Sequence, residues 1–156
     1  MKRENFFLTL LFLLLLFFSL YRYVKITKDT NGIFLFPTDD SYITLFYSLQ
    51  MAKGFPFKFN ENEPRIPMEP SFFAQIFYSL IYKLGIKNIE EFSLIVFWIN
   101  VIFLILTIFL IFYIFKICTT DNFLSFVALF MLSLFVPFRY IFYLGMGHSF
   151  LTLFFI

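Results

Sequence analysis

The sequence predicts an all-α protein, a polytopic bundle of transmembrane helices with amphipathic juxtamembrane helices in its first extracytoplasmic loop. Three observations support this fold class. Hydrophobic residues make up 61% of the 156 residues and charged residues only 14%, whereas soluble domains average about 25% charged residues. The apolar residues gather in runs long enough to cross a bilayer. Most of the prolines and charges lie between the first two runs.

The same composition excludes several classes of protein. A net charge of only +2 without a basic run argues against nucleic acid as a partner. So apolar a chain is also not intrinsically disordered. Cys118 is the single cysteine, which rules out an internal disulfide and a CxxC motif. Membrane lipids are therefore the first partner that the sequence predicts.

Four apolar runs are the predicted membrane spans. The first covers residues 5–24, and no small-residue cleavage site follows it, which favours an uncleaved anchor over a signal peptide. The second covers residues 92–115, has no charged residue and is closed by Lys116. The third and fourth cover residues 123–138 and 141–156. Because the last run ends within apolar sequence, we expect the chain to be the N-terminal part of a longer membrane protein.

The polar loop between the first two spans, about residues 25–91, contains two predicted helices. Residues 39–53 have apolar side chains at the spacing of one helical face, and on the opposite face lie Ser41, Thr44 and Ser48. Residues 71–84 are too few to span, and their apolar stripe comprises Phe73, Ile76, Phe77, Leu80, Ile81 and Leu84. We expect this stripe to lie in the lipid interface or against the bundle. Gly54 and Gly85 are the predicted stops.

Basic residues indicate the orientation of the chain. Lys2 and Arg3 precede the first span, and Lys116 follows the second. Positively charged residues near spans favour the cytoplasmic side. The N-terminus is therefore predicted inside and the polar loop outside, in a multi-pass protein of the cytoplasmic (plasma) membrane.

Two adjacent carboxylates, Asp39 and Asp40, lie just outside the first span at the start of a predicted helix. A helix N-terminus stabilises negative charge. An ionised carboxylate there can accept a proton from an attacking hydroxyl or hold a divalent cation. The alternative is structural, with Asp39 or Thr38 serving only as the helix N-cap.

From Asp39 the chain reads Asp-Asp-Ser-Tyr-Ile-Thr-Leu-Phe-Tyr-Ser-Leu-Gln-Met-Ala-Lys-Gly, and then, from Phe55, Phe-Pro-Phe-Lys-Phe-Asn-Glu-Asn-Glu-Pro. This order resembles the first extracytoplasmic loop of bacterial GT-C glycosyltransferases, multi-pass enzymes that use lipid-linked sugars. The residues in register are Asp39, Asp40, Ile43, Tyr47, Gly54, Asn60, Glu63 and Pro64. Farther on, Gly-Met-Gly-His resembles a Gly-Met-Glu-His element of these enzymes, with Gly147 in place of the Glu.

The resemblance implies that residues 1–156 form the N-terminal part of a GT-C-like transmembrane domain. Such an enzyme transfers a sugar from a polyprenyl-phosphate donor to a hydroxyl of a glycan, lipid or protein acceptor at the outer face of the membrane. By position, Asp39 would be the general base, and Asp40 its partner or the ligand of a divalent metal. Some members need such a metal and others do not, so the cofactor stays open.

Four further residues are candidate groups for binding the donor. Lys58, Arg65 and Arg139 are cations of the kind that bind phosphate, and His148 is an ionisable group within the predicted fourth span. The alternative for Lys58 and Arg65 is a solvated loop cation. For His148 it is a hydrogen bond between helices, which is also the predicted role of Asn100 in the second span.

The sequence is also compatible with a second class of protein. In this alternative the chain is a non-catalytic integral membrane protein that takes part in assembly or interaction. The Asp pair would then only cap a helix.

Overall fold

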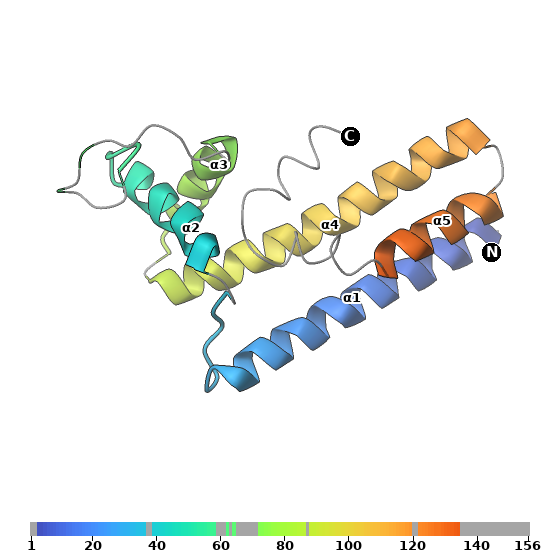
Figure 1. The fold of residues 1–156 in the computed structure, drawn as a ribbon, viewed down its shortest axis with the longest axis horizontal. Helices are drawn as coiled ribbons and strands as arrows, with labels where there is room; N and C mark the ends of the chain where they lie inside the picture. The colour runs from blue at the N-terminus through green and yellow to red at the C-terminus, as the bar shows by residue number, and fades with distance from the viewer. Residues whose placement is uncertain are drawn as a thin grey trace.

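The computed structural model describes residues 3–36, 39–58, 62, 64, 72–86, 88–119 and 122–134, and the regular structure in these ranges is entirely helical. The helices, shown in Figure 1, are α1 (Arg3–Asp29), α2 (Asp39–Ala52), α3 (Phe72–Tyr82), α4 (Ile89–Thr119) and α5 (Asn122–Leu134). The all-α prediction is confirmed for this part of the chain.

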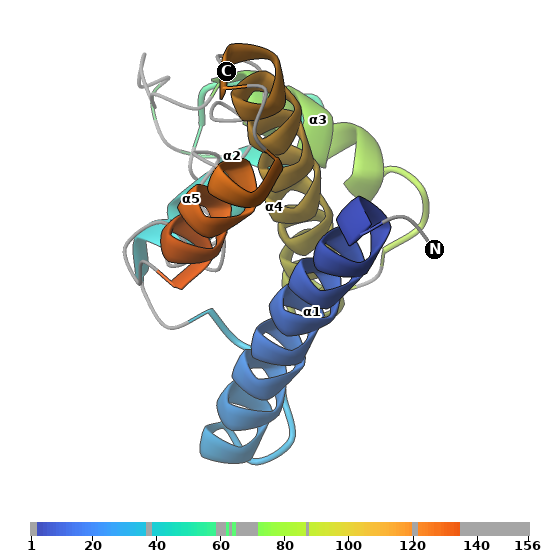
Figure 2. The ribbon, with the colours of Figure 1, turned by 90° about the vertical axis from the view of Figure 1, so that its right-hand side faces the viewer.

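The two long helices, α1 and α4, run in opposite directions along the molecule (Figure 1). α1 ends and α4 begins at the same end, and α2 and α3 lie at that end too. α5 turns back beside α4 and also contacts α1 (Figures 1 and 2). The described residues of the polar loop are thereby collected at one end of the long helices.

Both long helices are long and apolar enough to cross a membrane, over Leu8–Asp29 in α1 and Ile89–Cys118 in α4. Only 22% of the apolar window of α1 and 39% of that of α4 is buried inside the structure. α1 continues to Asp29, past the predicted end at residue 24. The helices expected over residues 5–24 and 92–115 are therefore present, and both are longer than predicted.

The predicted third span is described in part. α5 covers thirteen residues, Asn122–Leu134, which is fewer than a bilayer crossing needs. Ser125 and Leu129 are its buried residues, and α4 is the helix it packs against most. The rest of residues 123–138 and all of residues 141–156 lie outside the described residues, so spans three and four stay predictions.

Both loop helices form where the sequence predicts them. α2 begins at Asp39, as expected. The chain leaves the helix in a turn that includes Gly54, whose φ is +93°. α3 is described from Phe72, next to the predicted start at Ser71, which lies outside the described residues, and it gives way to a turn that ends at Gly85, with a φ of +109°. A positive φ is easily adopted by glycine, which has no Cβ, so the two glycines act as the predicted stops.

α2 and α3 pack against each other, and most of their buried side chains are small or polar. The buried residues of α2 are Ser41, Thr44, Leu45, Ser48 and Gln50, and those of α3 are Ala74, Gln75, Tyr78 and Ser79. Two hydroxyls are satisfied within their own helix, because Ser48 Oγ donates to the Thr44 carbonyl at 2.7 Å and Ser79 Oγ to the Ile76 carbonyl at 2.7 Å. Small residues at a helix contact allow close approach, as is common between membrane helices.

The apolar stripe of α3 is divided between two surroundings. Phe77 and Ile81 pack on the core, and the Phe77 ring lies 5.8 Å from that of Phe103 on α4. Phe73 and Leu80, in contrast, are 65% and 58% exposed. The sequence predicts that this stripe contacts either the lipid interface or the helix bundle. In the structure, part of the stripe packs against the bundle and part of it is uncovered.

A buried hydrogen bond joins α3 to α4. Tyr78 Oη donates to Asn100 Oδ1 at 3.0 Å, and both residues are fully buried. The Tyr82 ring also meets Phe92 edge to face, with 5.2 Å between centroids. Asn100 therefore has the predicted role of a polar contact between helices.

Candidate functional site

The Asp pair lies where the polar loop enters α2. The backbone of Asp39 and Asp40 forms the first turn of this helix. Their side chains, together with Pro37 and Thr38, are outside the described residues. The start of α2 does not distinguish a general base at a helix N-terminus from an N-cap, so both roles of the pair stay predictions.

Tyr42, one turn into α2, fixes this entry point. The backbone N–H of Phe36 donates to Tyr42 Oη at 3.1 Å, and the two rings meet edge to face with centroids 6.3 Å apart. Ser93 on α4 lies beside the Tyr42 hydroxyl, and its own hydroxyl donates to the Ile89 carbonyl at 2.7 Å. Tyr42 thus joins the end of the connection to α2, at a point next to α4.

The surroundings of Tyr42 are mainly apolar. Burial raises the pKa of Tyr42 above its ordinary value of 10.0, and the nearby carboxylate of Glu90 raises it further. The Phe36 backbone N–H and the neighbouring Ser93 side chain act in the opposite direction. Tyr42 is therefore neutral at physiological pH and acts here as a hydrogen-bonding group.

Aromatic rings support the connection between α1 and α2. We call them the aromatic cluster, and its members are Tyr23, Phe34, Phe36, Tyr42, Phe97 and Trp98. Phe34 lies at its centre, 4.8 Å from Phe97, 5.5 Å from Phe36 and 5.9 Å from Tyr23, measured between ring centroids. Phe34, Phe36 and Phe97 are buried. This packing sets the path of the chain toward the Asp pair.

A cavity of about 290 Å³ lies beside this connection. Its lining residues are Gly32, Ile33, Phe34, Asn88, Glu90, Glu91 and Leu94. The two glutamates belong to the first turn of α4, and Asn88 Oδ1 accepts a hydrogen bond from the Glu91 N–H at 2.7 Å. Asn88 therefore caps α4, and the acidic residues match the positive end of the helix dipole.

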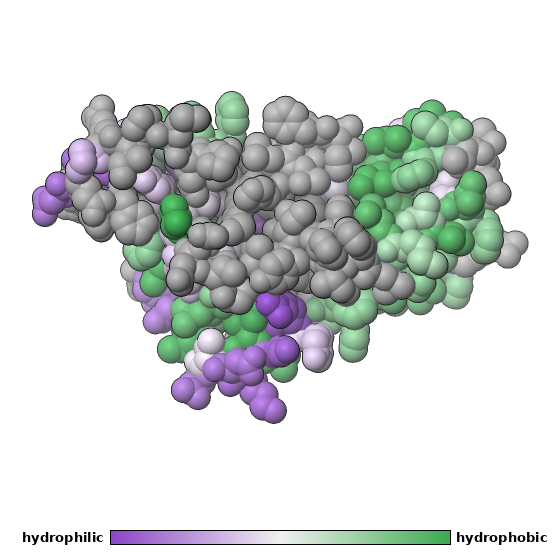
Figure 3. Space-filling view, in the orientation of Figure 1, coloured by the Kyte–Doolittle hydropathy of each residue, from purple (hydrophilic) through white to green (hydrophobic). Residues whose placement is uncertain are grey.

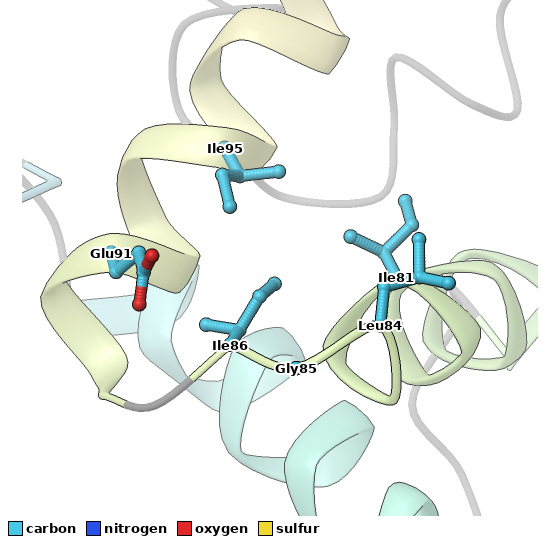
Figure 4. A pocket seen from close by; sticks show the side chains of 6 residues that line it. All are labelled: Ile81, Leu84, Gly85, Ile86, Glu91 and Ile95. Atoms are coloured by element: carbon cyan, nitrogen blue, oxygen red, sulfur yellow. The ribbon is translucent and has the colours of Figure 1, made fainter.

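A second cavity, of about 260 Å³, lies between the end of α3 and the start of α4 (Figure 4). Its lining residues are Ile81, Leu84, Gly85, Ile86, Glu91 and Ile95, with Glu91 opposite the α3 side chains. A single carboxylate among aliphatic side chains offers neither a paired acid and base nor a metal-ligand set. We assign no chemistry to this cavity.

The described residues hold no cluster of three or more His, Cys, Asp or Glu side chains that could bind a metal. The candidate ligand, Asp40, is not tested by this finding, because its side chain is outside the described set. A divalent metal at Asp40 stays a prediction.

The predicted donor-binding residues are described only in part. Lys58 is half-buried, and its Nζ lies 5.7 Å from the centroid of the Phe55 ring, a cation–π contact. Arg65, Arg139 and His148 lie outside the described residues. The position of these four residues relative to the Asp pair therefore stays a prediction.

No local pattern in the sequence indicates the role of Tyr42. It was predicted as one member of an apolar helical face, whereas its hydroxyl accepts a hydrogen bond from a residue six positions earlier. The aromatic cluster was also not foreseen, because a single ring in an apolar run gives no sign of its neighbours. The Phe34-Leu-Phe36 sequence before Pro37 is the one local signal, since alternate apolar residues in an extended segment point to the same side.

Comparison with protein-family models, with curated proteins and with solved structures finds no match to this chain.

Proposed function

We propose that the chain is part of a multi-pass membrane glycosyltransferase that acts at the outer face of the cytoplasmic membrane. The donor would be a sugar on a polyprenyl phosphate, and the acceptor a hydroxyl of a glycan, lipid or protein. Asp39 would act as general base and Asp40 as its partner or as ligand of a divalent cation. The order of motifs from Asp39 to Pro64, on the loop between two candidate spans, is the observation that carries this proposal.

The arrangement of the helices supports a site at a membrane surface. α1 and α4 run in opposite directions, and the start of α2 lies at the end where α1 stops and α4 begins (Figure 1). If both long helices cross the bilayer, the Asp pair lies beside one membrane face, where the phosphate of a lipid-linked donor is also found. Much of the apolar surface of both helices is exposed, as lipid contact requires.

The proposed chemistry needs one ionised carboxylate close to the acceptor hydroxyl. The N-terminal turn of α2 stabilises negative charge. Two adjacent carboxylates repel each other, so that burial of both would raise the pKa of one toward that of a useful base. The base would take the proton of the acceptor hydroxyl as its oxygen attacks the sugar carbon, and the lipid phosphate would leave with the bonding electrons.

Asparagine variants of the aspartates test this proposal. Asp39→Asn and Asp40→Asn keep the shape of each side chain and remove its charge. In membranes of cells that express the complete gene product, we expect sugar transfer from the lipid-linked donor to fall by at least about 10²-fold, the typical contribution of a general base. Asp121→Asn is the matched control, since Asp121 lies in the loop predicted on the cytoplasmic side.

Two results would decide against the aspartates as the catalytic groups. Wild-type turnover in both aspartate variants would remove the catalytic role, provided that membrane insertion is unchanged. Loss of transfer in Asp121→Asn to the same extent would show a general effect of lost charge.

The second candidate function is a non-catalytic membrane assembly protein. The exposed apolar side chains of α3 favour it, because such a surface can contact another membrane protein as well as lipid. In that case both aspartate variants would keep their partner, and co-purification would be lost instead on replacing Phe73 or Leu80 by serine.

A further inference from the structure

The C-terminal turns of α1 form one wall of a cavity that the proposed chemistry does not use. The cavity has a volume of about 200 Å³ and is lined by Arg22, Lys25, Ile26, Asp29, Thr30, Leu35 and Phe36. A single water needs only about 10–15 Å³ of such space, so this cavity has room for a group of several atoms. Figure 3 shows hydrophilic side chains gathered over this end of α1, among hydrophobic surface.

The charges in the cavity favour an anion. Arg22 and Lys25 contribute two positive charges, and Asp29 contributes one negative charge. No salt bridge among these three residues is present in the described part of the chain, although they lie within two turns of one helix. The excess of positive charge is therefore not neutralised within the cavity.

Arg22 gives a more specific indication. Its Nε is buried and has no hydrogen-bond partner among the described residues. A buried N–H without an acceptor is unfavourable, and guanidinium groups bind phosphate and carboxylate through two parallel hydrogen bonds. Thr30, which also lines the cavity, directs its hydroxyl to the Ile26 carbonyl at 2.7 Å and is not a partner of the Arg22 Nε.

We propose that this cavity binds a phosphate ester, held between Arg22 and Lys25. Arg fits phosphate through its planar fork of donors, and Lys adds a point charge. Ile26, Leu35 and Phe36 provide an apolar wall beside the cations, which suits the first carbons of a lipid chain. The same phosphate chemistry occurs in a lipid headgroup and in a soluble phosphate ester.

The position of the cavity relates it to the Asp pair. Phe36 lines the cavity, and Asp39 follows three residues later. Three residues span at most about 11 Å, so a phosphate in the cavity lies near the start of α2. The inference stands on the cavity alone, although a transferase with a lipid-phosphate donor would find here a binding site for that phosphate.

The test is a binding titration on the whole chain in phosphatidylcholine nanodiscs at 0.15 M salt. In one arm, phosphatidic acid is added to the bilayer in small amounts; in the other, glycerol phosphate is added to the solution. Phosphorus-31 NMR of the monoester reports the bound fraction. Neither probe carries a sugar, so the outcome is independent of glycosyl transfer.

Four variants identify the site. We expect Arg22→Gln to weaken binding about tenfold or more, the usual effect of losing a charge-assisted hydrogen bond. Lys25→Gln should weaken it about fivefold. Asp29→Asn should tighten it about twofold or more, because this carboxylate repels the ligand, and misfolding cannot produce a gain. Lys28→Gln is the matched control, since Lys28 is exposed on the same helix and does not line the cavity.

The two arms separate the sources of the phosphate. If the variants give this pattern with phosphatidic acid alone, the bound phosphate belongs to a lipid headgroup. If they give it with both probes, the site also binds soluble phosphate esters. The proposal is overturned if neither probe binds, if Arg22→Gln binds like the wild type, or if Lys28→Gln weakens binding as much as Arg22→Gln.

Discussion

The α2–α3 pair and the aromatic cluster meet at Tyr42, yet they bury opposite kinds of side chain. The pair buries Ser41, Thr44 and Ser48 and leaves Phe73 exposed. The aromatic cluster buries large rings, with Phe34 at its centre. In water, apolar faces are turned inward. The reversed arrangement of the pair is what we expect if the outward side of α3 meets lipid, where small and polar residues join helices.

The largest expected effect comes from the aromatic cluster. Phe97→Ala removes a ring that is fully buried against Phe34, and the free energy of unfolding should fall by about 3–5 kcal/mol. Leu80→Ala, on the exposed side of α3, should change it by no more than about 0.5 kcal/mol. Denaturant unfolding in detergent micelles measures both. Equal losses would mean that the outward side of α3 is packed like a core.

The next effect tests the close packing of the α2–α3 pair. Ser48 is completely buried on α2, so Ser48→Leu should force the helices apart at a cost of about 1–3 kcal/mol. Ile43→Leu, at a partly exposed position of the same helix, keeps the side-chain volume and serves as the control. A Ser48→Leu variant as stable as the wild type in the same unfolding experiment would contradict a tight small-residue contact.

A smaller effect concerns the hydrogen bond between α3 and α4. Tyr78→Phe removes the hydroxyl that donates to Asn100 Oδ1. The free energy of unfolding should fall by about 0.6 kcal/mol, the average measured for such bonds between membrane helices, and by at most about 1.7 kcal/mol. The same change in an Asn100→Ala background should have little further effect, and independent losses from the two changes would contradict coupling between them.

The smallest effect is a pH dependence at Tyr42. The folded pKa is raised above 10.0, so the folded protein holds this proton more tightly than the unfolded chain does. The resulting stability is fully present below pH 10 and is lost as the pH rises through the folded pKa. Tyr42→Phe should remove this part of the decline above pH 10 in thermal unfolding. If stability declines with pH in Tyr42→Phe as it does in the wild type, other titrating groups cause the decline.

Much of this fold could be predicted because its helix limits depend on local signals. Gly54 and Gly85 mark the ends of α2 and α3 through their positive φ angles. The longer extent of α1 could not be predicted in this way, since Arg22, Lys25 and Lys28 interrupt the apolar run without preventing a helix. Charged side chains with long aliphatic stems are good helix formers and can reach the membrane surface.

The buried face of each loop helix was beyond sequence reasoning. Periodicity separates Ser48 from Phe46 on α2, but it does not say which face meets a neighbour when the surroundings can be lipid. The candidate site was predictable only at its aspartates, where two carboxylates precede a helix. Tyr42 and Arg22 act through partners that tertiary packing brings to them, and their own neighbours in the sequence carry no sign of this.

Topology is the most direct test of the central claim, which is that the Asp pair lies at the outer face of the membrane. Cys118 is exposed and is the single cysteine, so a membrane-impermeant maleimide applied to intact cells reports its side. We predict no labelling of Cys118 and full labelling of Asn62→Cys in a Cys118→Ser background, since Asn62 is exposed in the same loop as the aspartates. Labelling of Cys118 but not of Asn62→Cys would place the aspartates in the cytoplasm and contradict the proposed function.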